Sequence, residues 1–417
     1  MMDSGKNSGL GIQKPLEGVR ILEYAIFYAG PGACAILSDL GADVIKIESR
    51  TGDPQRTWTR VGQFSFDLPH KRTLMFDCAN RNKRGITLDI EQQKGREIFH
   101  QLLKESDVFL TNLRPSTKKR LGIEYETLSK INPRIIHANV SGYGPKGPFC
   151  DVGAYDPMGQ ARSGMMFATG AKEPTLMQIA VLDQSTAISA SHAILSALFF
   201  RERSGLGQEV HVSLYSTALW LLYANTMLTS LMNIDASEAI DMIVFWDRPQ
   251  NHPLRNTFCC KDGKWVIGVH HPPGRYWEAF CRATGQEALL NDCRFDEEAK
   301  QYENSAEAIA IFDKVFAAKT RDEWMEILSS HGLMFGSIQM PTEVLHDHQA
   351  LENNYIVDFD HPDFGTVKIP GYPIHFSQGS VGTRSAAPTL GQHTDEVLQE
   401  MGYTTKEIEQ LRLENII

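Results

Sequence analysis

Short apolar runs alternate with amphipathic segments along the first half of the chain. Runs rich in β-branched and aromatic residues predict buried strands, and they lie at residues 18–24, 42–48, 107–112, 134–144 and 207–215. The segments between them, such as 30–40, 95–107 and 120–133, place apolar residues at helical spacing. Strands that alternate with helices of this length predict βαβ units. We therefore expect an α/β fold with a Rossmann-like, doubly wound parallel sheet.

The second half of the chain predicts a smaller α+β domain. Residues 258–270 indicate a hairpin with its turn at Asp262 and Gly263, and helical segments follow. Polar stretches containing proline or asparagine flank this region and are typical of linkers. We expect the following divisions: a frayed leader at 1–14, a large domain at 15–232, a linker at 233–256, a small domain at 257–339, a return linker at 340–369 and a C-terminal segment at 370–417 that docks on the large domain.

Composition narrows the class of protein. The 417 residues carry a net charge of −10, with 42% apolar and 22% charged residues, as in a soluble globular protein. The longest basic run is residues 118–120, which argues against a nucleic-acid partner. Residues 214–232 are apolar but contain polar side chains, so they predict a buried helix and not a membrane span. A polar N-terminus and seven cysteines without metal-type spacing favour a cytoplasmic protein with reduced thiols and no metal.

Nucleotide-phosphate loops are missing from the sequence. The turn after the first predicted strand carries Tyr28, Ala29 and Gly30, and G-x-G-x-x-G does not occur there. The pattern G-x-x-x-x-G-K-[ST] does not occur either. The predicted Rossmann-like shape therefore does not indicate NAD or ATP chemistry, and we expect no tightly bound cofactor.

Asp183 is the leading candidate for catalysis. A short apolar run ends at Asp183, and a long helix-forming segment follows at once and closes at Gly205. At such a strand-to-helix turn, backbone N–H groups and the helix dipole stabilise negative charge. We expect Asp183 to remain ionised at neutral pH and to attack an acyl group. The alternative is structural, because aspartate is also a preferred helix N-cap.

Five segments, in order, resemble one known family. They are LEGVRILEYAIFYAGPGACAILSDLGADVIKIE (16–48), NKRGITLDI (82–90), VSGYGPKGP (140–148), GLGQEVHVSLY (205–215) and APTLGQHTDEVLQEMGY (387–403). They resemble the class III CoA-transferases of the CaiB/BaiF type, which act on oxalate, carnitine, bile acids or aryl acids. The resemblance implies an interlocked dimer, either a homodimer or a heterodimer with a homologous subunit.

The resemblance also implies a chemistry. CoA passes from an acyl-CoA donor, such as succinyl-CoA, to a carboxylic acid through a covalent intermediate on Asp183. Coenzyme A thioesters are then substrates, and ATP is not needed because the thioester energy is kept. Residues at the family's CoA-binding positions are Tyr28, Ala29, Arg50, Leu88, Asn112, Arg114, Arg120, Tyr155 and Asp156. The alternatives are a solvated helix face for Arg114 to Arg120, and a helix-capping or solvated acid for Asp156.

Departures from the family pattern refine the expectation. Ser49 and Gly153 replace a family Arg and Lys, and the Gly-rich lid of the oxalate enzymes is missing, which argues against oxalate or formate. The racemase relatives carry a His where Tyr155 stands, and a phenol is a poor base at neutral pH. Three hypotheses remain: a CoA-transferase, which we favour, an acyl-CoA racemase or isomerase, and a structural subunit of a heteromeric CoA-transferase. The acceptor acid stays open.

Overall fold

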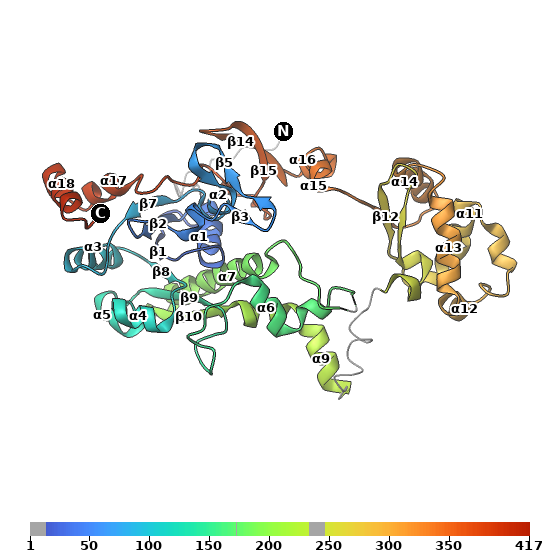
Figure 1. Cartoon of the computed structure of the whole chain (residues 1–417), viewed down its shortest axis with the longest axis horizontal. Helices are drawn as coiled ribbons and strands as arrows, with labels where there is room; N and C mark the ends of the chain where they lie inside the picture. Colours follow the sequence, from blue (N-terminus) through green and yellow to red (C-terminus); the bar gives the residue numbers. More distant parts are fainter. Residues whose placement is uncertain (1–13, 172, 233–246) are drawn as a thin grey trace, which may run out of the picture. The chain divides into compact units, whose positions relative to one another are not determined.

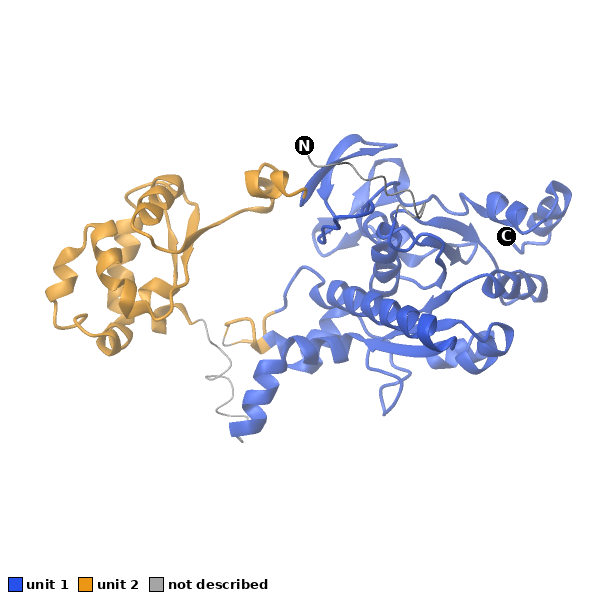
Figure 2. Cartoon of the chain, turned by 180° about the vertical axis from the view of Figure 1, so that it is seen from behind, with its two compact units in different colours: residues 1–166, 176–232, 355–417 blue, residues 167–175, 233–354 orange. Residues whose placement is uncertain are grey.

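The computed structural model describes residues 14–171, 173–232 and 247–417. The chain divides into two compact units, which are described separately (Figure 2). The first unit contains residues up to 166 together with 176–232 and 355–417, and the second contains 167–175 and 233–354. The predicted leader at 1–14 lies outside the described residues except for Lys14.

A six-stranded parallel sheet forms the centre of the first unit (Figure 1). Its order is β10-β9-β8-β1-β2-β7, and each neighbouring pair is parallel. The strands are β1 (Arg20–Tyr24), β2 (Asp43–Glu48), β7 (Arg84–Thr87), β8 (Val108–Thr111), β9 (Ile136–Ser141) and β10 (Gln208–Ser213). The predicted parallel sheet is confirmed. The order changes direction between β1 and β8, and such switch points accommodate ligands at the carboxyl ends of the strands.

The described residues of the first unit also form helices. They are α1 (Ala29–Asp39), α2 (Leu74–Asn80), α3 (Gln93–Lys104), α4 (Pro115–Leu121), α5 (Tyr125–Ile131), α6 (Asp156–Ser163), α7 (Val181–Ser204), α8 (Leu214–Leu221), α9 (Tyr223–Met232), α17 (Thr394–Glu400) and α18 (Thr405–Leu413). One apolar core joins α3, α5, α17 and α18 to the strands. The helix predicted over 120–133 is two helices, because Gly122 adopts φ 69° and ends α4.

The region predicted to be one buried helix, residues 214–232, differs from expectation. It forms α8 and α9, and α9 has no buried residue. Trp220 and Leu231 are each 72% exposed. Apolar composition predicted burial here, but among the described residues these side chains remain largely exposed. Among the described residues, no helix is both long and apolar enough to cross a membrane.

The C-terminal segment returns to the first unit. The N–H of His393 donates to Gly85 O at 2.9 Å, and the N–H of Thr87 donates to Thr394 Oγ1 at 3.0 Å, so the segment lies along β7. Residues 356–370, placed in the return linker from sequence, instead form the hairpin of β14 (Ile356–His361) and β15 (Gly365–Pro370). Two short hairpins complete the unit: β3 (Arg60–Val61) with β4 (Phe64–Ser65), and β5 (Asp67–Leu68) with β6 (Arg72–Thr73).

The second unit is α+β, as the sequence predicts. Its antiparallel sheet contains β11 (Thr257–Cys259), β12 (Trp265–Gly268) and β13 (Phe335–Ile338). Its helices are α11 (Trp277–Thr284), α12 (Glu298–Glu303), α13 (Ser305–Phe316), α14 (Arg321–Ser330), α15 (Pro341–Val344) and α16 (His348–Glu352). The linker predicted over 233–256 ends earlier, because Leu254 and Asn256 are fully buried in this unit. Residues 233–246 lie outside the described residues.

Candidate active site

Asp183 lies in the first turn of α7, as its third residue. The residue before the helix, Ala180, is left-handed with φ 48°, and turn residues rather than a strand precede it. The helix predicted after this turn is present, but the strand predicted before it is not. Asp183 is also not the N-cap, so the structural role weighed from sequence does not apply to it.

Asp156 caps this helix from a neighbouring element. Its Oδ2 accepts the N–H groups of Leu182 at 2.6 Å and Asp183 at 3.1 Å. Its Oδ1 accepts Gln160 Nε2 at 2.5 Å, and the residue is 4% exposed. Asp156 is the first residue of α6, so one buried carboxylate joins the starts of two helices. The structure therefore supports the helix-capping alternative for Asp156, because this carboxylate accepts backbone N–H groups of α7.

The acidity of Asp183 follows from this arrangement. Burial, together with the neighbouring charge of Asp156, raises the pKa of Asp183 to about 7. The sequence predicts an ionised Asp183 stabilised by the helix N-terminus. With a pKa of about 7 the carboxyl is only partly ionised at neutral pH, because burial and the charge of Asp156 oppose its ionisation. Asp183 is a half-buried carboxyl that ionises close to neutral pH, as suits a nucleophile that must be formed and regenerated.

Tyr28 lies beside Asp183, at the N-cap of α1. α1 and α7 approach closely: a Cβ built on Gly32 would lie 3.1 Å from Ala187 Cβ and 3.4 Å from the Tyr28 ring. Burial raises the pKa of Tyr28 to about 12, with contributions from Cys78 and from the charge of Asp183. The phenol therefore stays protonated and can donate a hydrogen bond. Ala29 is the first residue of α1 and is 8% exposed.

An aromatic cluster of Phe27, Trp58 and Tyr155 adjoins these residues. Phe27 is edge-on to Tyr155 at 5.2 Å and to Trp58 at 5.8 Å, and Trp58 lies 6.2 Å from Tyr155. Tyr155 is 54% exposed and directly precedes Asp156. Sequence reasoning missed Phe27 and Trp58, because nothing local distinguishes a site aromatic from a core aromatic.

Several predicted CoA-binding residues follow the carboxyl ends of the strands. A small cavity of about 70 Å³ lies there, lined by Tyr24, Ala25, Ile26, Ile47, Glu48, Ser49, Gly52, Asp53 and Leu113. Asn112 holds the adjoining turn, because it accepts the Ile26 N–H at 3.0 Å and donates to Ile26 O at 2.6 Å. Arg50 is exposed just after β2. This edge is the switch point of the sheet, and ligands of doubly wound folds generally bind at such points.

The other predicted CoA-binding residues divide into two groups. Arg114 lies against Gly153: a Cβ there would be 2.5 Å from Arg114 Nη2, so the missing side chain leaves room for the guanidinium. Arg120 is exposed and pairs with Glu91 at 2.7 Å. Leu88, by contrast, is 1% exposed and belongs to the core under the sheet. Its N–H donates to Glu48 O at 2.9 Å.

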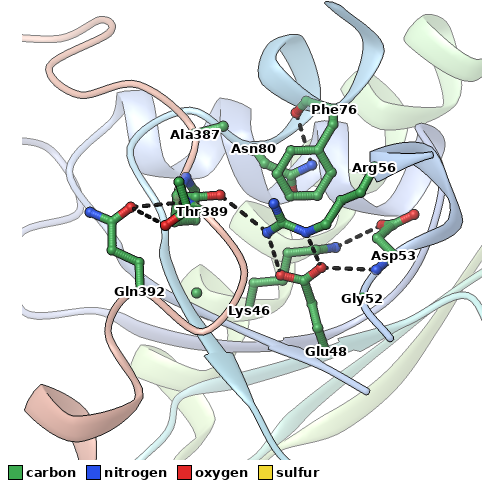
Figure 3. Close-up of polar contacts among 12 residues, drawn as sticks. Lys46, Glu48, Gly52, Asp53, Arg56, Phe76, Asn80, Ala387, Thr389 and Gln392 are labelled. Atoms are coloured by element: carbon green, nitrogen blue, oxygen red, sulfur yellow. Dashed lines mark hydrogen bonds and ion pairs between the residues drawn. The ribbon is translucent and has the colours of Figure 1, made fainter. Parts of the chain in front are cut away.

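A buried charged cluster follows the carboxyl end of β2 and was not predicted from the sequence (Figure 3). Lys46 Nζ contacts Asp53 Oδ2 at 3.1 Å, and Glu48 accepts two bonds from Arg56, at 2.6 and 2.7 Å. Arg56 also stacks on Phe76 at 3.8 Å. A cavity of about 270 Å³ adjoins Arg56 and Phe76. Its lining residues are Arg56, His70, Lys71, Arg72, Thr73, Phe76, Asp77, Pro388, Thr389 and Leu390. Lysines are rarely buried, so no sequence pattern pointed to this cluster.

Metal chemistry has no obvious centre in the described residues. Across 14–171, 173–232 and 247–417, no three His, Cys, Asp or Glu side chains come together as metal ligands would. The groups that converge near Asp183 are instead a second carboxylate, a phenol and aromatic rings.

A doubly wound parallel sheet with a half-buried carboxyl of raised pKa, Asp183, near a protonated phenol is consistent with an acyl-transferring enzyme, and the comparisons specify the family. The model of CoA-transferase family III matches residues 16–394. The chain belongs to this family and is a family III CoA-transferase.

Known relatives agree with this assignment. The chain is similar to an "Acyl-CoA transferase" of Fusarium pseudograminearum, with 34% identity over 97% of this chain and 89% of the relative. It is also similar to the succinyl-CoA:glutarate CoA-transferase of Mus musculus, with 31% identity over 97% and 90%. Among solved structures, a CAIB/BAIF family protein from Brucella suis superposes with a TM-score of 0.82 at 29% identity, over 94% of this chain and all of that one.

Proposed function

We propose that this enzyme moves CoA from an acyl-CoA donor, such as succinyl-CoA, to a carboxylic acid through a covalent intermediate on Asp183. The observation that carries the proposal is the position of Asp183: a half-buried carboxyl with its pKa raised to about 7, beside Tyr28 and the aromatic cluster. An acid that ionises near neutral pH serves both as attacking group and as leaving group.

The reaction divides into four steps. An Asp183 oxygen attacks the donor thioester carbonyl, the C–S bond breaks, and CoA thiolate leaves a mixed anhydride. The thiolate attacks the Asp183 carbonyl, which releases the donor acid and forms an aspartyl-CoA thioester. The acceptor carboxylate displaces the thiolate to form a second anhydride. The thiolate then attacks the acceptor carbonyl, which frees the new thioester and regenerates the Asp183 carboxylate.

Each tetrahedral intermediate carries an oxyanion that needs donors. The protonated phenol of Tyr28 and the N–H groups at the start of α1 are our candidates. Arg50, Arg114 and Arg120 are the proposed contacts for the CoA phosphates, because guanidinium groups pair with phosphate oxygens in a bidentate way. Asn112 contributes by fixing the turn at Ile26.

The acceptor is proposed to be an apolar or aromatic carboxylic acid. The support is the cluster of Phe27, Trp58 and Tyr155, which places three rings next to the Asp183 region. A panel of aryl-, branched-chain and small dicarboxylic acids with succinyl-CoA, analysed by mass spectrometry, tests this. A preference for the small dicarboxylic acids would contradict it.

The intermediate can be trapped. Hydroxylamine attacks an activated aspartyl carbonyl, so donor thioester plus hydroxylamine is expected to inactivate the enzyme and to leave a hydroxamate on Asp183. Peptide mass spectrometry locates the adduct, and hydroxylamine without donor is the control. Full activity with no adduct on Asp183 would exclude the covalent intermediate on Asp183 and would favour direct transfer or another nucleophile.

Assembly and location belong to the same proposal. We expect a homodimer, or a heterodimer with a homologous subunit, and the interlocked form follows from family membership alone. The exposed apolar side chains of α8 and α9 support association, since a folded monomer seldom leaves so many exposed. Light scattering of the purified chain distinguishes monomer from dimer. A cytoplasmic location is proposed, and fractionation tests it.

A further inference from the structure

The turn between β1 and α1 is fixed to an unusual degree. Phe27 adopts φ 63°, a left-handed conformation that is unfavourable for a bulky residue. The Phe27 N–H donates to Asp53 Oδ1 at 3.2 Å. Asn112 binds both the N–H and the carbonyl of Ile26. These contacts hold the backbone immediately before Tyr28.

Two fully buried lysines, Lys46 and Lys83, bind the same turn. Lys46 Nζ donates to Glu23 Oε1 at 2.9 Å, to Ala25 O at 2.8 Å and to Asp53 Oδ2 at 3.1 Å. All three ammonium N–H donors of Lys46 are thereby used. Figure 3 shows its contact with Asp53. One of the three bonds reaches the backbone two residues before Phe27.

Lys83 repeats the arrangement on the other side of the turn. Its Nζ donates to Glu23 Oε2 at 2.6 Å, to Pro31 O at 2.8 Å and to Asn80 Oδ1 at 2.9 Å. Glu23 therefore links the two lysines, with one oxygen for each. Pro31 lies in the first turn of α1. The lysines thus hold the backbone at Ala25 and at Pro31, on either side of Tyr28.

The four charged groups balance one another. Burial alone would raise the pKa of Glu23, but Lys46 and Lys83 outweigh it and hold that pKa below its ordinary value. Two lysines and two acids, Glu23 and Asp53, give no net charge. Buried ion pairs are seldom more stabilising than well-packed apolar side chains, so stability by itself is a weak reason for this network. Its bonds to three backbone atoms of one turn indicate a positional role.

We propose that Glu23, Lys46, Asp53 and Lys83 are positioning residues of the active site, which hold the turn at 25–31 so that Tyr28 and the start of α1 face Asp183. None of the four touches the reacting atoms. They act through the backbone on either side of Tyr28. The proposal rests on the proposed function in one respect only, namely that Asp183, which the turn faces, is the catalytic group.

A charge-balanced double variant tests the role. Lys83→Met with Glu23→Gln removes one positive and one negative charge, keeps the volumes similar and deletes the bond to Pro31 O. We expect kcat to fall by about 10- to 100-fold, as misplacement of catalytic groups does, with KM for the donor thioester little changed. The matched control is Arg201→Met with Asp107→Asn, which removes the 2.8 Å pair at the amino end of β8. The control is expected to keep kcat even if its melting temperature falls.

A second measurement does not require the variant to fold. In the unaltered enzyme, hydrogen exchange at the Ile26 and Phe27 amides is expected to be as slow as in β1, because both N–H groups are bonded to side chains. Fast exchange there, or an unchanged kcat in a folded Lys83→Met/Glu23→Gln variant, would overturn the proposal. Amide hydrogen exchange at Ile26 and Phe27 does not depend on the chemistry of Asp183. Failure of the covalent mechanism would therefore be detected separately, by the hydroxylamine experiment.

Discussion

Asp156 Oδ2 accepts the backbone N–H of Asp183 at 3.1 Å, so a buried carboxylate supports the helix turn that carries Asp183 and also opposes the ionisation of its side chain. The two effects are separable, because the hydrogen bonds depend on the oxygen and the electrostatic effect depends on the charge. Asp156 is thereby better described as a cap than as a CoA ligand.

The first prediction concerns Asp156→Asn. The amide oxygen can still accept the N–H groups of Leu182 and Asp183, but the negative charge is lost. Burial remains, so the pKa of Asp183 is expected to fall below about 7 without returning to its ordinary value. The acid limb of the kcat profile should therefore move to lower pH. An acid limb that stays in place, in a variant of normal stability, would show that Asp156 does not influence Asp183.

The second prediction concerns stability and Asp183→Asn. A carboxyl whose folded-state pKa lies above its unfolded value favours folding below the unfolded pKa, and this contribution is lost as pH rises through the folded pKa. For Asp183 that loss is complete above about pH 7. The Asp183→Asn side chain does not ionise, so the variant avoids the cost of a buried negative charge. Its melting temperature should therefore rise at pH 8 and change less at pH 5.

The same variant is expected to be inactive. Removal of a nucleophile lowers turnover by at least about 10³-fold. A protein that is more stable at pH 8 and has lost transfer would show that the buried carboxyl serves chemistry and not folding. Asp151→Asn, at an exposed acid, is the control for general effects of charge. Near-normal transfer by Asp183→Asn, with deamidation excluded, would remove Asp183 from the mechanism.

Much of the fold could be predicted from sequence, because apolar runs separated by amphipathic segments specify a parallel sheet through local patterning. β7 (Arg84–Thr87) was missed because its four residues include an arginine and a glycine and form no apolar run, unlike the equally short β8. The error at 214–232 has a different cause. Apolar content indicates that a side chain favours burial, but it does not identify a neighbour that would cover Trp220.

The site was predictable only in part. Asp183 was singled out because it stands at the start of a long helix, and the family resemblance then favoured a catalytic role over a structural one. Its partner Asp156 lies 27 residues earlier, and their contact is tertiary, so no spacing rule reveals it. Lys46 and Lys83 are the clearest limit, because lysine normally indicates surface. Only the fold shows that Glu23 and Asp53 together compensate the two buried charges.

The third prediction concerns CoA recognition by Arg120. If its guanidinium leaves Glu91 to pair with a phosphate, Arg120→Ala should weaken the binding of CoA esters by about 1.5–3 kcal/mol. The loss should be the same for every acyl group, because the phosphates are remote from the acyl end. Titration calorimetry at low salt measures it, and Arg134→Ala, another exposed arginine, is the control. An unchanged affinity would leave Arg120 as a solvated residue paired with Glu91.

The last prediction distinguishes transferase from racemase and depends on Tyr155. A racemase needs a base on each side of the α-carbon, and the phenol of a tyrosine is a poor base at neutral pH. With a 2-methylacyl-CoA in D₂O, we expect no deuterium at the α-carbon by mass spectrometry. Tyr155→Phe keeps both ring contacts but loses the hydroxyl, so trapping at Asp183 should persist while turnover slows by the ~1–3 kcal/mol of one hydrogen bond. Rapid α-exchange without an acceptor acid would instead identify the racemase chemistry.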